Sequence, residues 1–494
     1  GSGSFHKTEA SGIYLIKTST EYHRDGMEHR RRQMAGRKRH VRGRKGNQKK
    51  KQKTKRRLWL LFALSVLFLG CILYDCQRKG LLQKEWNKIT QPGSTEKPVS
   101  TTSGDEQMIR VLLTNDAMNS IYHDKVRISG TAELLVRQNG QTKVYDKGQT
   151  ISVSANNTKK SAKTVRISCP KGRIRVESIT RSGKVQAYRG TMKLVRKKQG
   201  LILINTLSLR EYLYGVVPSE MPSSYPMEAL KAQAVCARSF AWRQMRSNSY
   251  KAYGADVDDT TAFQVYHMAG EDARTRRAVD RTAGKKVYSG DHVITTYYYS
   301  TSWGCSASEQ EAWGTAKGSN YPVRFQTDSE DVGQGLSSEM RFYDFITGSK
   351  ETYDSGYDWY RWSVTLSADT LGAKLGIGTV RKITVISRGK SGLIRKLRVR
   401  GSLGRITLEG QEEIRQKLYP SETEITKKKS GETAVLSMLP SAAFTVLDGS
   451  EKGTRTFTLI GGGLGHGVGM SQNGAGEMAR QGKNYRQILK HYYS

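Results

Sequence analysis

Cysteine is scarce in this chain, which has only five among its 494 residues. So few, spread so thinly, exclude a disulfide scaffold of the kind that small secreted domains use. Long apolar runs are equally scarce. Only residues 58–74 form an uncharged apolar stretch, and this excludes a polytopic membrane protein. With 36% hydrophobic and 26% charged residues the chain is also unlike a disordered protein, and its length predicts two to four domains.

Acidic residues are few relative to basic ones: 44 Asp and Glu stand against 82 Lys and Arg, for a formal net charge of +38. Residues 1–57 hold 19 Lys and Arg and 4 Asp and Glu, which is +15 of that charge and leaves +23 for the rest of the chain. A charge of this size is typical of nucleic-acid-binding proteins, so its location decides which partners it can meet.

The apolar stretch predicts a single transmembrane helix over residues 58–76, slightly short of the roughly 20 residues of a full span. The positive-inside rule then places the basic segment 1–57 in the cytoplasm and the rest of the chain outside. We therefore expect a single-pass cell-membrane protein with an extracytoplasmic catalytic domain. No nucleic-acid partner is expected unless residues 1–57 meet DNA or anionic lipid. A buried core helix, a cleaved signal peptide and lipidation at Cys71 are the competing interpretations.

The rest of the chain predicts an α+β fold. Residues 77–108 are polar and predict a linker. Residues 109–200 alternate short β-type runs with turn signals such as Asn139-Gly140, which indicates a small antiparallel β domain. Residues 201–494 mix strand and helix patterns, including a helix from Pro226 to about Met245, and predict a mixed α/β catalytic core.

Glu220 is a candidate catalytic residue because Pro218 and Pro222 hold the backbone on both sides of it. A carboxyl in a rigid, apolar bend can have its pKa raised by desolvation and act as a general acid. On the helix that follows, Lys231 and Arg238 are seven residues apart and share one face, where they could hold hydroxyls or carboxylates of an extended substrate. A solvated glutamate and an ordinary cationic face remain the competing interpretation.

His466 lies in a glycine-rich loop whose backbone could approach a ligand closely. A tight structural crossing explains the glycines equally well, and the loop lacks the ending of a phosphate-binding loop. No metal site is apparent, because Cys169, Cys236 and Cys305 are far apart in sequence and no two histidines have ligand spacing. A nucleophilic role for Cys236 or Cys305 has no support, and buried structural cysteines are the simpler interpretation.

Five segments together resemble the SpoIID/LytB family over roughly residues 109–494. They are residues 212–222 (YLYGVVPSEMP), 226–241 (PMEALKAQAVCARSFA), 259–266 (DTTAFQVY), 299–304 (YSTSWG) and 465–475 (GHGVGMSQNGA). The resemblance implies a peptidoglycan lytic transglycosylase. Such an enzyme cleaves the bond between N-acetylmuramic acid and N-acetylglucosamine in glycan strands whose stem peptides are gone. It leaves 1,6-anhydro-muramoyl ends, in septal wall remodelling during spore engulfment.

The resemblance also assigns roles to residues. It implies that Glu220 is catalytic and that one carboxyl suffices, because the C6 hydroxyl of the substrate serves as nucleophile and the same glutamate donates and then accepts a proton. Glycosidases commonly need two carboxyls. The substrate-binding residues that it implies are Lys231, Arg238, Gln264, Tyr266, Ser300, Ser302, His466, Ser471 and Gln472.

Two departures from the family pattern concern zinc and the groove. Some members bind zinc through Cys and His near the Asp-Thr-Thr segment, but Val257 and Phe263 stand where those cysteines would fall, so we expect no metal and no cofactor. Trp303 interrupts the Ser-Thr-Ser-Gly-Gly pattern and changes the groove. The implied partners are a SpoIIP-like amidase or endopeptidase and a SpoIIM-like membrane anchor. The competing function is a LytB-like, non-catalytic enhancer of an amidase.

Overall fold

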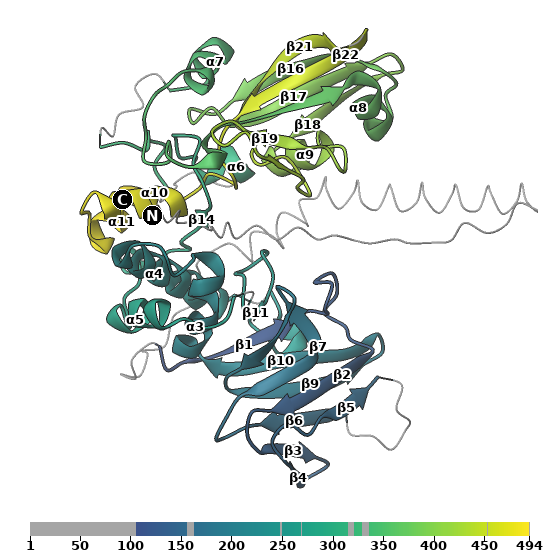
Figure 1. Ribbon diagram of the computed structural model, residues 1–494, viewed down its shortest axis with the longest axis vertical. Coiled ribbons are helices and arrows are strands. Elements are labelled where there is room, and N and C mark those ends of the chain that lie inside the picture. The colour runs from purple at the N-terminus through teal and green to yellow at the C-terminus, as the bar shows by residue number, and fades with distance from the viewer. Residues whose placement is uncertain are drawn as a thin grey trace, which may run out of the picture. The chain divides into compact units, whose positions relative to one another are not determined.

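The computed structural model describes residues 105–155, 163–247, 249–267, 269–314, 321–328, 335–451 and 453–493. Several sheets and helices follow one another along these residues, and this confirms the α+β architecture (Figure 1). The expectation of a preceding transmembrane helix is corrected, since no helix of the described fold is long and apolar enough to cross a membrane. The segments 1–57 and 58–76 and the linker up to residue 104 lie outside the described residues.

The N-terminal part of the described fold consists of two β-sheets around a shared apolar core. The larger sheet has, in spatial order, β11 (Val257–Asp258), β1 (Met108–Leu113), β10 (Gly200–Ser208), β9 (Thr191–Lys197), β6 (Thr164–Ser168), β3 (Leu134–Gln138) and β4 (Gln141–Tyr145). The smaller has β5 (Ile151–Ser154), β2 (Lys125–Gly130), β7 (Ile174–Arg181) and β8 (Lys184–Tyr188).

Two sequence signals in this part, the Asn-Gly turn and the apolar run 201–205, correspond to a hairpin and a strand of the structure. Asn139 and Gly140 both have positive φ and join β3 to β4 in a tight hairpin, as the Asn-Gly pair predicts. The strand expected at residues 201–205 lies within β10 and pairs with both β1 and β9. Residues 201–208 therefore lie in the same sheet as the strands before them.

Three helices follow this sheet: α3 (Leu209–Glu220), α4 (Met227–Gln244) and α5 (Ala273–Arg281). Ser208 begins α3 with a capping box, in which its hydroxyl accepts from the Glu211 amide and the Glu211 carboxylate accepts from the Ser208 amide. Pro226 precedes α4, where its missing N–H costs no intrahelical hydrogen bond. Small buried side chains on α4, including Ala234 and Ala237, allow α3 and α5 to pack closely against it.

The C-terminal part has its own apolar core. One sheet has the order β20 (Thr433–Ala434), β19 (Ile425–Lys427), β15 (Trp362–Ser367), β22 (Thr454–Gly461), β21 (Phe444–Glu451), and another is formed by β16 (Val380–Arg388), β17 (Ile394–Gly401) and β18 (Arg405–Glu409). Short ladders pair β12 (Tyr288–Ser289) with β13 (His292–Val293), and β14 (Tyr298–Tyr299) with β23 (Met470–Ser471). The helices are α6 (Glu309–Trp313), α7 (Glu339–Thr347), α8 (Ala368–Leu375), α9 (Gln411–Lys417), α10 (Gln472–Arg480) and α11 (Tyr485–Tyr493).

The last two helices return to the first half of the chain. Both α10 and α11 pack against α4, and the parallel pairing of β14 with β23 places residues 298–299 beside residues 470–471 (Figure 1). Glu220 at the end of α3 thus meets Gln472, which is 252 residues away in sequence.

Candidate active site

Glu220 is the last residue of α3, and three distant segments hold it in place. Its Oε1 accepts a hydrogen bond from the Val265 backbone N–H at 2.7 Å, and its carboxylate is also hydrogen-bonded to the Tyr298 side chain. Its backbone carbonyl accepts from Nε2 of Gln472 at 3.0 Å. The residue as a whole is half-buried, while the carboxyl itself lies among protein groups that hold it fixed.

The environment of Glu220 favours the protonated acid. Burial raises its pKa to about 7, although the hydrogen bonds from Val265 and Tyr298 act in the opposite direction by stabilising the carboxylate. No cation is among the groups that shift this pKa. At neutral pH both protonation states of Glu220 are therefore substantially populated, which is the condition for a group that donates a proton and then accepts one.

A buried chain of amide and phenol groups orients Tyr298. Nε2 of Gln264 donates to the Tyr298 hydroxyl at 3.0 Å and to the Ala237 carbonyl at 3.3 Å, and Oε1 of Gln264 accepts from the Tyr212 hydroxyl at 3.3 Å. Since the Tyr298 oxygen already accepts from Gln264, its proton is free to point to Glu220. Burial raises the pKa of Tyr298 well above 10, so Tyr298 stays a neutral donor. The structure thus brings the predicted Gln264 and Gln472 together with Glu220.

His466 acts on the backbone of this site and not on the carboxyl itself. Its Nδ1 accepts from the Val468 N–H at 3.1 Å, so its Nε2 carries the proton and donates to the Tyr298 carbonyl at 3.1 Å. Burial lowers the pKa of His466 to about 4 and keeps the ring neutral. The glycine loop is at the same time a close crossing, because a Cβ at Gly469 would lie 2.1 Å from the Tyr297 carbonyl oxygen.

Ser300, Ser302 and Ser471 form a support for the start of α10. The Ser471 hydroxyl accepts from the Gly474 N–H as the N-cap of α10 and donates to Oδ1 of Asp354 at 2.5 Å. The Ser300 carbonyl accepts from the Asn473 N–H at 3.0 Å. The Ser302 hydroxyl is buried and donates to the Cys305 carbonyl, so it is directed away from any substrate.

Asp354 is a second carboxyl with a perturbed pKa. It is fully buried, and burial raises its pKa to about 7 against hydrogen bonds from Ser471, from the Ser302 N–H and from the Gly474 N–H. These contacts tie it to the same helix N-terminus that carries Gln472. No motif marks Asp354 in the sequence, and the Val265 N–H, being a backbone group, leaves no side-chain signal at all. Tyr298 lies one residue before the 299–304 motif and could have been included with it.

The expected substrate contacts of Arg238 and Tyr266 are corrected, whereas that of Lys231 stays a prediction. Arg238 is completely buried, pairs with Asp105 at 2.8 Å and donates to the Val279 carbonyl, so it is not available to a substrate. Lys231 pairs with Glu228 at 2.6 Å and stacks 4.7 Å from the Tyr485 ring centroid. Tyr266 is buried and donates to Asn205. Arg238 and Tyr266 therefore serve the scaffold, whereas the Lys231 side chain stays partly exposed.

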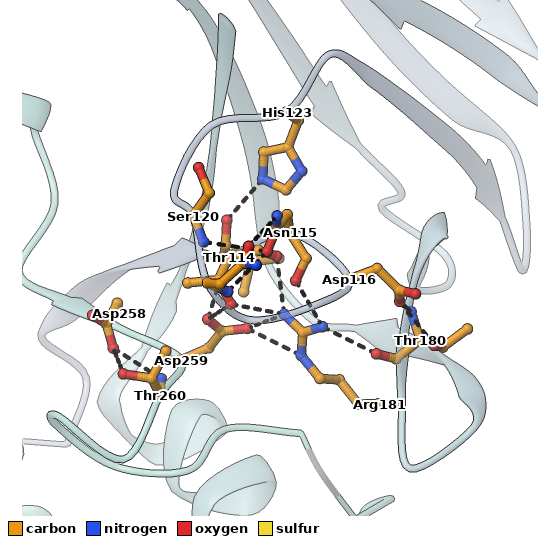
Figure 2. A network of polar contacts seen from close by, with 12 residues as sticks. Thr114, Asn115, Asp116, Ser120, His123, Thr180, Arg181, Asp258, Asp259 and Thr260 are labelled. Carbon is orange, nitrogen blue, oxygen red and sulfur yellow. Dashed lines mark hydrogen bonds and ion pairs between the residues drawn. The ribbon is translucent and has the colours of Figure 1, made fainter. Parts of the chain in front are cut away.

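A buried ion pair fixes the start of the segment that leads to Val265. Figure 2 shows Asp259 accepting from the Thr114 N–H at 2.9 Å and from Nη2 of Arg181 at 2.7 Å. Arg181 also donates to the Thr114 and Asn115 carbonyls. Both charged side chains are essentially inaccessible to solvent. The network fastens residues 259–265 to the N-terminal sheets, six residues before the N–H that contacts Glu220.

The residues of this region are not arranged as a metal site. Val257 is buried in β11, and Phe263 packs on the N-terminal core. Across the described ranges, no group of three or more His, Cys, Asp and Glu side chains is placed to hold a metal ion.

The cysteines of the described residues are buried thiols. Cys236 is within 3.3 Å of the Tyr493 hydroxyl, and burial raises its pKa to about 12. Burial also raises the pKa of Cys305 well above its ordinary value. Neither thiol supplies a thiolate near neutral pH, in line with the structural interpretation of both.

Comparison with known proteins identifies two family models in the chain. The model described as Stage II sporulation protein (SpoIID) matches residues 197–288, which include Glu220 and Gln264. The model described as Domain of unknown function (DUF8618) matches residues 309–469.

Three curated relatives are similar to this chain. The amidase enhancer of Bacillus subtilis (strain 168) is 32% identical over 297 residues, which are 57% of this chain and 39% of that protein. Stage II sporulation protein D of the same organism is 30% identical over 309 residues, 59% of this chain and 74% of that protein. An uncharacterised protein of Brachyspira hyodysenteriae (strain ATCC 49526 / WA1) is 29% identical over 318 residues, 62% and 71% of the two chains.

Proposed function

The chain belongs to the stage II sporulation protein D family, and from this premise we propose that it is a cell-wall enzyme, a lytic transglycosylase of peptidoglycan. The proposed substrate is a glycan strand without stem peptides, cut between N-acetylmuramic acid and N-acetylglucosamine. The observation that carries the proposal is the position of Glu220: a half-buried residue whose carboxyl has a pKa of about 7 and is held by the Val265 N–H and by Tyr298.

The proposed reaction uses Glu220 twice. Its proton goes to the glycosidic oxygen as the bond to the anomeric carbon breaks, and the C6 hydroxyl oxygen of the muramoyl residue then bonds to that carbon. The proton of the hydroxyl returns to Glu220, so no water is consumed and the carboxyl is regenerated. The Val265 N–H and Tyr298 stabilise the carboxylate that exists between the two transfers. A second carboxyl, which ordinary glycosidases need, is not required.

One relative supports a different function. The amidase enhancer of Bacillus subtilis carries a name that describes stimulation of another enzyme, and it is as similar to this chain as the sporulation protein is. The alternative proposal is therefore a non-catalytic wall-bound enhancer. In both cases we propose that the described residues act outside the cytoplasm beside an amidase, which removes stem peptides. The proposed partners are a SpoIIP-like amidase or endopeptidase and a SpoIIM-like membrane anchor.

Replacement of the proposed acid tests the enzyme hypothesis. Glu220→Gln keeps the shape of the side chain and its contact with the Val265 N–H but has no proton to donate, so we expect turnover of peptide-free glycan to fall by about 10²-fold or more. The matched control is Glu477→Gln, because the Glu477 carboxylate pairs with Arg480 and Gln481 of its own helix turn and contacts neither Glu220 nor its partners among the described residues. Full turnover by folded Glu220→Gln would contradict the assignment, whereas unchanged stimulation of an amidase by it would favour the enhancer.

A further inference from the structure

β16, β17 and β18 form a three-stranded sheet (Figure 1). The side chains of this sheet make one face apolar and the other cationic. The inward side chains, among them Ile383, Leu397 and Leu408, are buried in the C-terminal core. The outward face carries Lys382, Arg398, Arg400 and Arg405, all exposed, and we call these four residues the cationic face. It lies within the part of the chain that matches a domain of unknown function.

The register of the sheet places three of these cations directly opposite one another. Lys382 on β16 faces Arg400 on β17, which in turn faces Arg405 on β18. Side chains in such positions on one face are about 5 Å apart at Cβ, and like charges there destabilise a sheet. Folding alone therefore gives no reason for this row of three cations.

No acidic side chain of the described ranges forms an ion pair with Lys382, Arg400 or Arg405. An ion pair on this sheet joins Lys396 to Glu409 at 2.6 Å. Lys396 lies four residues before Arg400 on β17, so this pair is at the other end of the strand from the row. Arg398 lies between, opposite Thr384 and Thr407, whose hydroxyls add hydrogen-bond donors beside the guanidinium. The cationic face is thus an exposed grid of fixed positive charge, with about 4.8 Å between strands and about 7 Å between successive outward residues.

We propose that the cationic face binds an anionic cell-wall polymer with a phosphodiester backbone. Guanidinium groups match phosphate oxygens in pairs, and a repeating anion would remove the repulsion within the row. Single-stranded nucleic acid is less well matched, since no aromatic side chain lies among the outward residues of these strands to stack on a base. The surface would hold the protein on the wall independently of what Glu220 does.

Binding of the full chain to poly(glycerol phosphate), measured by titration calorimetry over a series of salt concentrations, tests the proposal. We expect the triple variant Arg398→Gln, Arg400→Gln, Arg405→Gln to bind at least about tenfold more weakly and with a shallower salt dependence. The control is the triple variant Arg274→Gln, Arg277→Gln, Arg281→Gln on α5, which removes the same charge from another exposed surface and should change binding less than about twofold.

The melting temperature separates this interpretation from misfolding. Because like charges are removed, the cationic-face variant should melt at the same temperature as the wild type or higher. If the triple variant melts at a lower temperature than the wild type, the binding comparison is made with the single variant Arg400→Gln instead. Equal binding by the wild type and the cationic-face variant, equal weakening by the α5 control, or tighter binding of polyadenylate than of poly(glycerol phosphate) would each overturn the proposal.

Discussion

Glu220 shows how a single carboxyl acquires two uses from its surroundings. Burial disfavours the carboxylate, and two hydrogen bonds favour it, so the pKa settles at about 7 instead of near its ordinary value of 4.5. The flanking prolines and the apolar setting made Glu220 predictable as a buried acid. The identity of its partners was not predictable, because Tyr298 and the Val265 N–H reach it only through contacts across 45 residues or more.

Lys231 and Arg238 show what sequence spacing cannot predict about single residues. Helical spacing correctly places the two on one side of α4, since seven residues make nearly two turns. What spacing cannot show is whether that side is open. Arg238 is covered by α5 and Asp105, whereas Lys231 lies against Tyr485 of α11 and stays partly exposed.

The raised pKa of Glu220 predicts a specific dependence of stability on pH. The folded state holds the proton up to about pH 7, whereas the unfolded chain releases it near pH 4.5, so Glu220 lowers the free energy of unfolding as pH rises between these values. Glu220→Gln removes this term. Denaturant unfolding measures the free energy of unfolding of the variant minus that of the wild type. We expect this difference to be about 1–3 kcal/mol larger at pH 8 than at pH 4.5. An identical difference at both pH values would show that Glu220 titrates normally.

At the scale of elements, the segment between β11 and Gln264 connects the N-terminal sheets to the site. Asp259 is the first residue of the 259–266 motif, and its pairing with Arg181 joins that motif to β7 (Figure 2). Sequence patterns predicted the Asn139-Gly140 hairpin and α4 with Pro226 at its start, because these depend on neighbouring residues. The Arg181–Asp259 pair joins positions 78 residues apart and carries no local signal.

Breaking this ion pair should destabilise the protein. Asp259→Asn keeps the shape of the side chain but leaves the Arg181 guanidinium buried without a counter-charge, which typically costs about 3–5 kcal/mol of unfolding free energy. The control is Asp448→Asn, because Asp448 and its partner Arg455 are 52% and 48% exposed and the loss of this pair should cost about 1 kcal/mol or less. Denaturant unfolding of the two variants measures the difference, and equal losses would mean that the buried pair has no special role.

For the whole molecule, the site depends on both halves of the chain. Glu220 comes from the N-terminal half, whereas Gln472, His466 and the strand pairing that fixes Tyr298 come from the last 30 residues. The five motifs in family order predicted that these parts work together, but the sequence could not show that Gln472 meets the backbone of Glu220. Of the net charge of +38, first suggestive of nucleic acid, +23 lies after residue 57, and the cationic face carries four of the cations that contribute to it.

The products formed from peptide-free glycan strands test the central claim most directly. The purified wild-type protein, without an amidase, should release fragments whose muramoyl ends have the mass of the 1,6-anhydro form, 18 mass units below the hydrolysed form by loss of one water, and mass spectrometry measures this. Glu220→Gln should release none. Fragments with ordinary reducing ends would indicate hydrolysis, and no fragments from folded wild type would contradict the account and leave the enhancer function.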